Sequence, residues 1–307
     1  MLVYILKRAG FNLGVMLVVV TLTFFLMHLL PGDPFMSQRL NPEIKANLYA
    51  KHGLDQPVAR QYLDYLSALA RFDLGESLKY PGRTVNEIIA ESFPVSAAVG
   101  ILALVLALVL GVTLGVLAGV WQSRWPDRLI LAFSTLGLSI PNFALGAGLV
   151  YLFALKLKIF PVAMLEKPID LVLPVLTLAA WPAAVITRLI RTEMIEVLKR
   201  DYIIAAMVRG LDPARVILRH ALPNALPAVI HYSGPLAATL LTGSFIVEKI
   251  FALPGLGQYY ITSIGNRDYN LVAGITIFYT FVLLVATFLT DLLAFSMNPQ
   301  LRYRNGS

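Results

Sequence analysis

Six apolar windows, each long enough to cross a membrane as a helix, constrain this chain more than any other feature. They cover residues 9–30, 95–121, 129–155, 171–190, 226–247 and 271–297. A helix needs about 20 mostly apolar residues to cross the roughly 30 Å hydrocarbon core. Of the 307 residues, 58% are hydrophobic and 14% are charged, and the mean hydropathy is +0.73. We therefore predict an all-α transmembrane domain of six spans that occupies residues 1–307.

The first window follows Lys7 and Arg8, as the apolar part of a secretory signal would. It is longer than most such segments, however, and it ends in the sequence HLLPGDPF instead of the small residues of a cleavage site. We interpret residues 9–30 as an uncleaved first span.

Basic residues near the span ends predict the orientation, because short cytoplasmic connections carry more Lys and Arg than external ones. They gather on one predicted side, at Lys7, Arg8, Arg124, Arg128, the run from Arg188 to Arg219, Arg302 and Arg304. This side, with both termini, is expected to be cytoplasmic. The opposite loop, residues 31–94, is also basic, but loops of that length cross the membrane irrespective of charge.

Composition and motifs exclude several functions. The net charge of +7 lies at span ends and not in one stripe, so it indicates affinity for anionic lipid and not for nucleic acid. The chain has no cysteine, which excludes disulfides and thiolate metal sites. It also contains no Walker A, zinc-protease or serine-hydrolase motif. We expect no catalytic residue and no cofactor in this chain.

The loop 31–94 is predicted to fold into small helices. Asn41 before Pro42 is typical of a helix start, and Gly53 of a helix end. Thr84 and Glu87 have the spacing of a capping box just before the second span. These helices are expected to pack on the outer face of the bundle, where they could also contact a partner.

The loop 191–225 between the fourth and fifth spans contains signals for two short helices. Asp201 is predicted to cap the first, Arg209 to lie in its last turn and Gly210 to end it in a left-handed conformation. Its apolar residues, Ile203, Ile204, Met207 and Val208, are expected to share one face.

The second short helix is predicted to start at Asp212 and Pro213, a cap and first-position pair, and to stop at Pro223. Two interpretations of the whole segment remain open. It either rests in the lipid headgroups as an amphipathic helix or docks into a cleft of another protein. The defined helix end favours docking, because a helix on a lipid surface needs no fixed stop.

Several motifs along the whole chain carry a family resemblance. AAMVRG (205–210) followed by HALPN resembles the cytoplasmic EAA-type loop of ABC importer permeases, in which a coupling helix docks onto the ATP-binding subunit. LLPGDPF, SFPVSA, LSIPNF and the run from Gly243 to Val272 resemble the OppB/DppB group, which serves peptides and nickel chelates. The segment 77–97 is most similar to the oligopeptide B-type subunit.

The resemblance implies a six-helix type I importer permease in the bacterial inner membrane. It implies as partners a second homologous permease, two ATP-binding subunits that bind ATP and magnesium, and an extracytoplasmic peptide-binding protein. It places coupling residues at Asp201, Ala205, Ala206, Met207, Arg209, Gly210, Leu211 and Pro223. Ile204 stands where the glutamate that names the loop would fall, so no contact of that glutamate is carried over.

Polar residues inside apolar windows are the candidates for a transport path, because they are costly in lipid and face the bundle interior. They are Ser139, Asn142, Ser233, Thr239, Thr242 and Ser244. Pro141 is expected to interrupt the third span beside the first two. A proline kink and small-residue helix packing are the alternative roles.

Other functions are alternatives to the oligopeptide permease, the first of them through the same resemblance. A dipeptide or nickel-chelate importer permease belongs to the same group. An ion-coupled secondary transporter would be expected to show charged residues at the midplane and internal repeats, and neither is clear. An intramembrane enzyme has no constellation of residues to support it.

Overall fold

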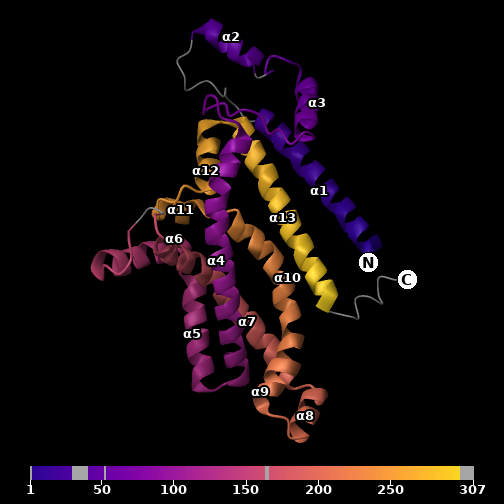
Figure 1. Cartoon of the computed structure of the whole chain (residues 1–307), viewed down its shortest axis with the longest axis vertical. Coiled ribbons are helices and arrows are strands. Elements are labelled where there is room, and N and C mark those ends of the chain that lie inside the picture. The colour runs from indigo at the N-terminus through magenta and orange to yellow at the C-terminus, as the bar shows by residue number, and fades with distance from the viewer. Residues whose placement is uncertain (1, 30–40, 52, 163–165, 298–307) are drawn as a thin grey trace. The chain divides into compact units, whose positions relative to one another are not determined.

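The computed structural model describes residues 2–29, 41–51, 53–162 and 166–297. Regular structure in this part of the chain is helical, apart from one isolated bridge between Glu76 and Thr84. The helices fall into two compact units, which are described separately below (Figure 1). One comprises Val95–Pro254 and Val282–Ser307, and the other comprises Leu2–Pro94 and Gly255–Phe281. Two long helices, α4 (Val85–Val120) and α13 (Tyr269–Met297), contribute residues to both.

Helix α7 (Val172–Leu198) is the centre of the first unit. It follows a short 3₁₀ turn, η2 (Pro168–Leu171), and it continues past Arg191 to Leu198. Helices that pack extensively against it include α5 (Trp125–Ser139), α6 (Asn142–Leu149) and α10 (Leu222–Leu241). Its buried side chains therefore form the middle of this unit's apolar core.

Three glycines of α4, Gly111, Gly115 and Gly119, let that helix approach α7 closely. A Cβ added to each would lie 2.6–2.7 Å from the Cβ of Ile186, Ile190 and Met194, respectively. Such distances are shorter than any ordinary carbon–carbon contact. The spacing of four residues is the small-residue pattern by which membrane helices bring their backbones together. We call these three glycines the α4 seam.

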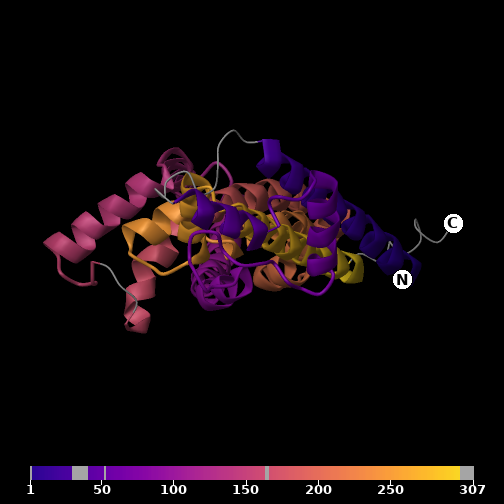
Figure 2. The ribbon, with the colours of Figure 1, turned by 90° about the horizontal axis from the view of Figure 1, so that it is seen from above.

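The third predicted span, 129–155, is broken at Ile140 and Pro141, where the sequence predicted an interruption. Helix α5 ends at Ser139, and the line of α6 with the π-helical η1 (Val150–Lys156) turns by 104°. Figure 2 shows α6 and η1 running out to the left. Pro141 is the physical reason, because proline lacks an N–H and drives the preceding residue out of the helical region. Ile140 is accordingly extended, with φ −83° and ψ 119°.

The fifth predicted span, 226–247, also differs from the structure. Helix α10 ends at Leu241, Gly243 adopts φ +81°, and a new short helix, α11 (Phe245–Ile250), follows. In the described part of the chain, four helices are long and apolar enough to cross a membrane, or up to five with the bent pair, and α10 is not among them. A count of six spans therefore remains a prediction.

The second unit contains α1 (Leu2–Leu29), α2 (Pro42–Lys51), α3 (Val58–Leu69) and α12 (Leu256–Asn266). As predicted, α2 starts at Pro42 with Asn41 accepting from the N–H of Glu43. The capping box is confirmed: Thr84 Oγ1 accepts from Glu87 N–H at 3.2 Å, and Glu87 Oε2 accepts from Thr84 N–H at 3.0 Å. Residues 31–40 of the predicted loop, and Arg302 and Arg304, lie outside the described residues.

Asp268 ties the start of α13 to the segment that precedes α4. Its fully buried carboxylate accepts hydrogen bonds from the Ser77 hydroxyl and from the N–H groups of Leu78 (3.1 Å) and Lys79 (3.3 Å). It also accepts from the N–H of Leu271 at 3.2 Å, in the manner of a helix cap. One side chain thus fixes two segments that are about 190 residues apart in sequence.

Candidate functional site

The segment after α7 forms a short helix whose C-terminal end is capped by backbone hydrogen bonds. Helix α8 (Asp201–Val208) is followed by Gly210, whose φ of +76° is the left-handed conformation predicted for it. The N–H of Gly210 bonds to Met207 O at 3.0 Å, and the N–H of Leu211 bonds to Ala206 O at 3.3 Å. These two bonds make a complete Schellman motif, which satisfies the last carbonyls of the helix. Helix α8 therefore ends at a fixed residue with a fixed exit direction.

The start of α8 differs by one position from the prediction. Arg200, and not Asp201, is the residue before the first helical turn, with an extended φ of −74° and ψ of 144°. Asp201 is the first helical residue, and no side chain caps the helix. Its negative charge in the first turn still favours the positive end of the helix dipole.

The second predicted helix starts as expected but does not stop at Pro223. Asp212 accepts a hydrogen bond from Arg215 N–H at 3.1 Å and caps α9 (Pro213–Val216). The chain then passes through a π-helical turn, η3 (Ile217–Ala221), directly into α10. In this wider turn the N–H of Leu222 bonds to Ile217 O, five residues back. The extra width accommodates the proline ring that would clash with a regular helix.

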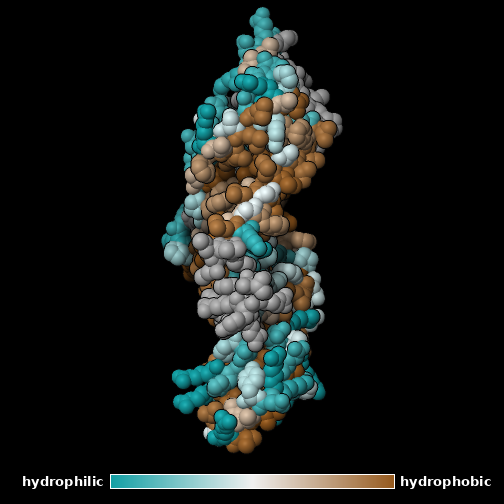
Figure 3. All heavy atoms as spheres, turned by 90° about the vertical axis from the view of Figure 1, so that its right-hand side faces the viewer, coloured by the Kyte–Doolittle hydropathy of each residue, from teal (hydrophilic) through white to brown (hydrophobic). Residues whose placement is uncertain are grey.

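The apolar residues of α8 differ in burial, although Ile203 and Met207 lie one helical turn apart on the same side of the helix. Ile203 is fully buried in the core of the first unit, whereas Ile204, Met207 and Val208 are 50%, 46% and 83% exposed. Tyr202 is exposed beside them. Figure 3 shows hydrophobic atoms at the tip of the end where α8 and α9 lie, surrounded by hydrophilic ones. Ile203 anchors the helix, and the other apolar side chains form a patch that faces outward.

A buried ion pair joins α5 to α7 on the same side of this unit as α8. Arg191 donates from Nε to Asp127 Oδ1 at 2.6 Å and from Nη2 to Asp127 Oδ2 at 2.8 Å, a bidentate geometry. Asp127 is 2% exposed and also accepts from Ser123 N–H at 2.8 Å. The helix that leads into α8 is thereby held to α5.

The six candidate path residues differ in the hydrogen bonds that their side chains make. Ser233, Thr239 and Thr242 each donate to a carbonyl of their own helix, α10 or its cap, and Ser244 caps α11. Ser139 ends α5 and is exposed, and Asn142 begins α6 across the break at Pro141. All six lie in the first unit. Four of the six side chains thus make local hydrogen bonds, Ser139 is exposed and Asn142 is half-buried, and their place along a path is a proposal.

Two features of this unit escaped sequence reasoning. The α4 seam was visible as the pattern GVTLGVLAG, residues 111–119, which matches the known small-residue motif. Asp127 and Arg191 gave no such signal, because 64 residues separate them and each stands among other charged residues at a span end. Only the packing of α5 on α7 brings the pair together.

These helices define the class of the protein, a polytopic helical membrane protein. Two family models match the chain: one for the inner membrane component of binding-protein-dependent transport systems over residues 111–303, and one for the N-terminal part of such components over residues 1–100. The chain therefore belongs to the family of binding-protein-dependent transport permeases, the non-catalytic inner-membrane components of ABC importers, and within it to the oligopeptide and dipeptide group.

Curated relatives match almost the whole chain. The dipeptide transport system permease DppB of Bacillus subtilis is 43% identical over 97% of this chain and 97% of its own length. The oligopeptide transport system permease OppB of Haemophilus influenzae is 40% identical over 99% of this chain and 100% of its own. An inward-facing structure of the MetNI methionine ABC transporter aligns with a TM-score of 0.58 and 18% identity, covering 69% of this chain and 96% of that one. The last comparison shows a shared fold.

Proposed function

We propose that this chain pairs with a second, homologous permease and that the two line a passage for oligopeptides into the cell. The main support for this proposal comes from the geometry of helix α8. It has a fixed end, an anchoring side chain in the core and an exposed apolar patch of Tyr202, Ile204, Met207 and Val208. A cleft on an ATP-binding subunit requires such a defined element, whereas a lipid surface does not.

The energy would come from two ATP-binding subunits that bind ATP and magnesium. Their closure would displace the docked α8, and Ile203 would pass the displacement to the core around α7. The α4 seam and the Asp127–Arg191 pair make α4, α5 and α7 move together. Rigid-body motion of this kind would switch the permease pair between inward- and outward-facing states.

An extracytoplasmic peptide-binding protein would deliver the cargo. Support for oligopeptides comes from the segment 77–97, which is most similar to the oligopeptide B-type subunit. A dipeptide importer is the second candidate, favoured by the 43% identity to DppB of Bacillus subtilis. Uptake of dipeptides and of longer peptides by the reconstituted complex, with its binding protein and with or without ATP, decides between the two. Uptake without ATP would refute the proposal.

Gly210 offers a direct test of the docking role. The Gly210→Val variant should cost on the order of 1–3 kcal/mol locally, because a β-branched residue is strained at φ +76°. No atom lies within 4 Å of an added Cβ, so the effect comes from the backbone and not from a clash. We expect an assembled permease pair whose ATP hydrolysis is weak or no longer linked to uptake.

The matched control is Gly210→Asn, because asparagine tolerates the left-handed conformation. It should retain most of the wild-type uptake and hydrolysis. Both are measured on the purified complex in proteoliposomes with its binding protein. Wild-type values for Gly210→Val would contradict the docking role of α8.

The path residues are tested by bulky substitutions. Asn142→Trp and Thr242→Trp should reduce peptide uptake severalfold if both side chains face the passage, while ATP-subunit binding persists. Unchanged uptake by both variants would show that these residues serve helix packing and do not line the passage.

A further inference from the structure

A cavity in the second unit is lined by groups that would bind an organic cation. It has a volume of about 220 Å³ and lies among the C-terminal end of α1, helix α3, the segment 73–78 and the start of α13. Small-molecule sites usually enclose roughly 300–1,000 Å³. The cavity is therefore large enough for one end of a peptide-sized ligand and too small for the whole of it.

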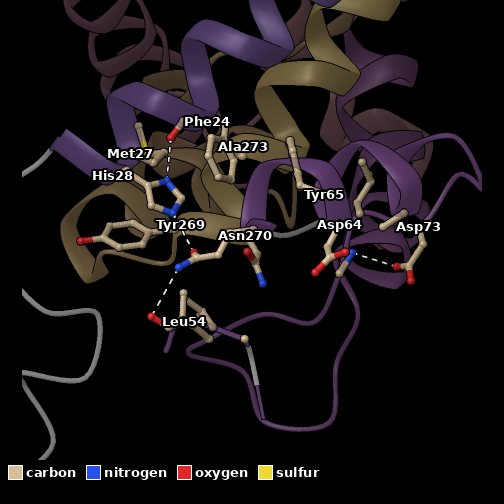
Figure 4. Close-up of a pocket in the computed structure, with 16 residues that line it drawn as sticks. Phe24, Met27, His28, Leu54, Asp64, Tyr65, Asp73, Tyr269, Asn270 and Ala273 are labelled. Carbon is tan, nitrogen blue, oxygen red and sulfur yellow. Dashed lines mark hydrogen bonds between the residues drawn. The ribbon is translucent and has the colours of Figure 1, made fainter. Parts of the chain in front are cut away.

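The charged groups of the cavity are acidic. Asp64 and Asp73 both line it, and the described residues around it include no lysine or arginine. In Figure 4 the two carboxyl groups lie on one side, His28 lies on the other, and Asn270 lies between them. Asp64 is already paired with the exposed Arg60, at 3.3 Å. Asp73 is left as the carboxylate without a cationic partner among the described residues.

Two acceptor atoms of the cavity, on the exposed Asp73 and the half-buried Asn270, have no hydrogen bond from the described residues. Asp73 Oδ1 accepts from the Gly75 N–H at 2.9 Å, and Asn270 Nδ2 donates to Glu76 O at 2.8 Å. No described group bonds to Asp73 Oδ2 or to Asn270 Oδ1. Both free atoms accept hydrogen bonds only, so the ligand that suits them is rich in donors.

His28 does not act as a free donor or metal ligand here. Its Nδ1 lies 2.8 Å from Phe24 O and its Nε2 lies 2.9 Å from Gln61 Oε1; because both oxygens only accept, a neutral ring donates to one of them at a time. The other side of the Gln61 amide donates to Gln56 O at 2.7 Å, which sets its orientation. The described residues hold no cluster of three metal-ligating side chains. The cavity thus suits an organic cation better than a metal ion, which would need more oxygen ligands.

Much of the remaining wall is apolar and aromatic, and it also holds the buried Tyr65 hydroxyl, which has no hydrogen-bond partner among the described residues. Phe24, Met27 and Ala273 lie together in Figure 4, and Tyr65 lies beside Ala273. Burial raises the pKa of the Tyr65 phenol, so that its ring is a neutral surface. Aromatic faces attract cations, and the aliphatic groups accept an apolar side chain. Acceptors on one side and apolar groups on the other match an ammonium group with an apolar substituent.

We propose that this cavity binds the N-terminal end of a peptide, with the α-ammonium at Asp73 and Asn270 and the first side chain against Phe24 and Met27. The proposal rests on the proposed peptide import and adds a recognition site in the permease itself. The N-terminal α-ammonium is the donor group that every unblocked peptide carries. The predicted orientation places this cavity on the extracytoplasmic side, where peptide would arrive.

The test measures equilibrium binding of radiolabelled trileucine to the complex of both permeases and ATP-binding subunits in nanodiscs, without the binding protein. Unlabelled trileucine should compete, and N-acetyl-trileucine, which lacks the ammonium, should compete at least tenfold more weakly. This arm needs no variant, so it does not depend on the folding of a mutant. Equal competition by the two peptides would overturn the proposal.

Asp73→Asn should weaken trileucine binding about tenfold, because it removes the charge and keeps the shape. The matched control is Asp55→Asn, an exposed acid between α2 and α3 that does not line the cavity. It should bind as the wild type does. Equal affinities for the two variants, or no binding by a complex that still imports peptide with its binding protein, would refute this site. Failure of ATP-dependent uptake by the wild-type complex would instead refute the proposed function.

Discussion

Replacing Gly115 with alanine tests whether the α4 seam holds α4 to α7. The new Cβ would lie 2.7 Å from Ile190 Cβ and 2.7 Å from Thr187 O. Comfortable carbon contacts begin at about 3.5 Å, so the helices must separate by roughly 0.8 Å. Overpacking of this kind costs about 1–3 kcal/mol. The contact with a carbonyl oxygen belongs to the backbone and cannot be relieved by a side-chain rotation.

The helix propensity of alanine opposes the cost of overpacking. Alanine has about 1 kcal/mol better helix propensity than glycine, so an alanine without a clash should be neutral or stabilising. Gly14 of α1 supplies the matched control, because an added Cβ there would meet nothing within 4 Å. The sign of the change in stability therefore distinguishes a close helix contact from an ordinary helical glycine.

Thermal unfolding of the purified complex measures both variants. We expect Gly115→Ala to lower the midpoint by a few degrees and Gly14→Ala to leave it unchanged or raise it slightly. Gly115→Val, which is larger, should lower it further. A midpoint for Gly115→Ala equal to that of Gly14→Ala would refute the close approach of α4 to α7.

Two other predictions concern the ion pair and the orientation. Asp127→Asn should destabilise the complex by about 2 kcal/mol, because it leaves the partly buried Arg191 without its charge partner, and Arg191→Lys should also lose stability because lysine cannot make both bonds. Thermal unfolding of the two variants checks this, and wild-type midpoints would contradict it. Single cysteines at Arg209 and Tyr62 should react with a membrane-impermeant reagent from the cytoplasmic and external sides, respectively; external labelling at position 209 would overturn the predicted topology.

Local sequence signals predicted the features that depend on a few neighbouring residues. The capping box of Thr84 and Glu87, the left-handed Gly210 and the Asp212 cap are all present in the structure. Each is set by hydrogen bonds within one turn of the chain, so its energy is nearly independent of what packs around it. The membrane class likewise follows from apolar windows alone.

Packing overrode local signals at other positions. Pro223 is a helix breaker in sequence, yet the wide turn of η3 carries the chain through it because the residues on either side, Val216, Ala221 and Ala225, are buried in the core. Ile203 and Ile204 are the same residue type in adjacent positions, but only Ile203 meets that core. No local pattern distinguishes the two.

Contacts between distant segments were decided by tertiary structure alone. Asp268 bonds to Ser77 and its neighbours, Asp127 to Arg191, and the walls of the cavity come from α1, α3 and α13. Each of these contacts requires two or more helices to pack at a particular relative position. That position is set by the shapes of many buried side chains together. The sequence by itself determined the membrane class and the local helix ends at Thr84, Gly210 and Asp212. The tertiary structure decided which faces are buried, which charges pair, and where a ligand could bind.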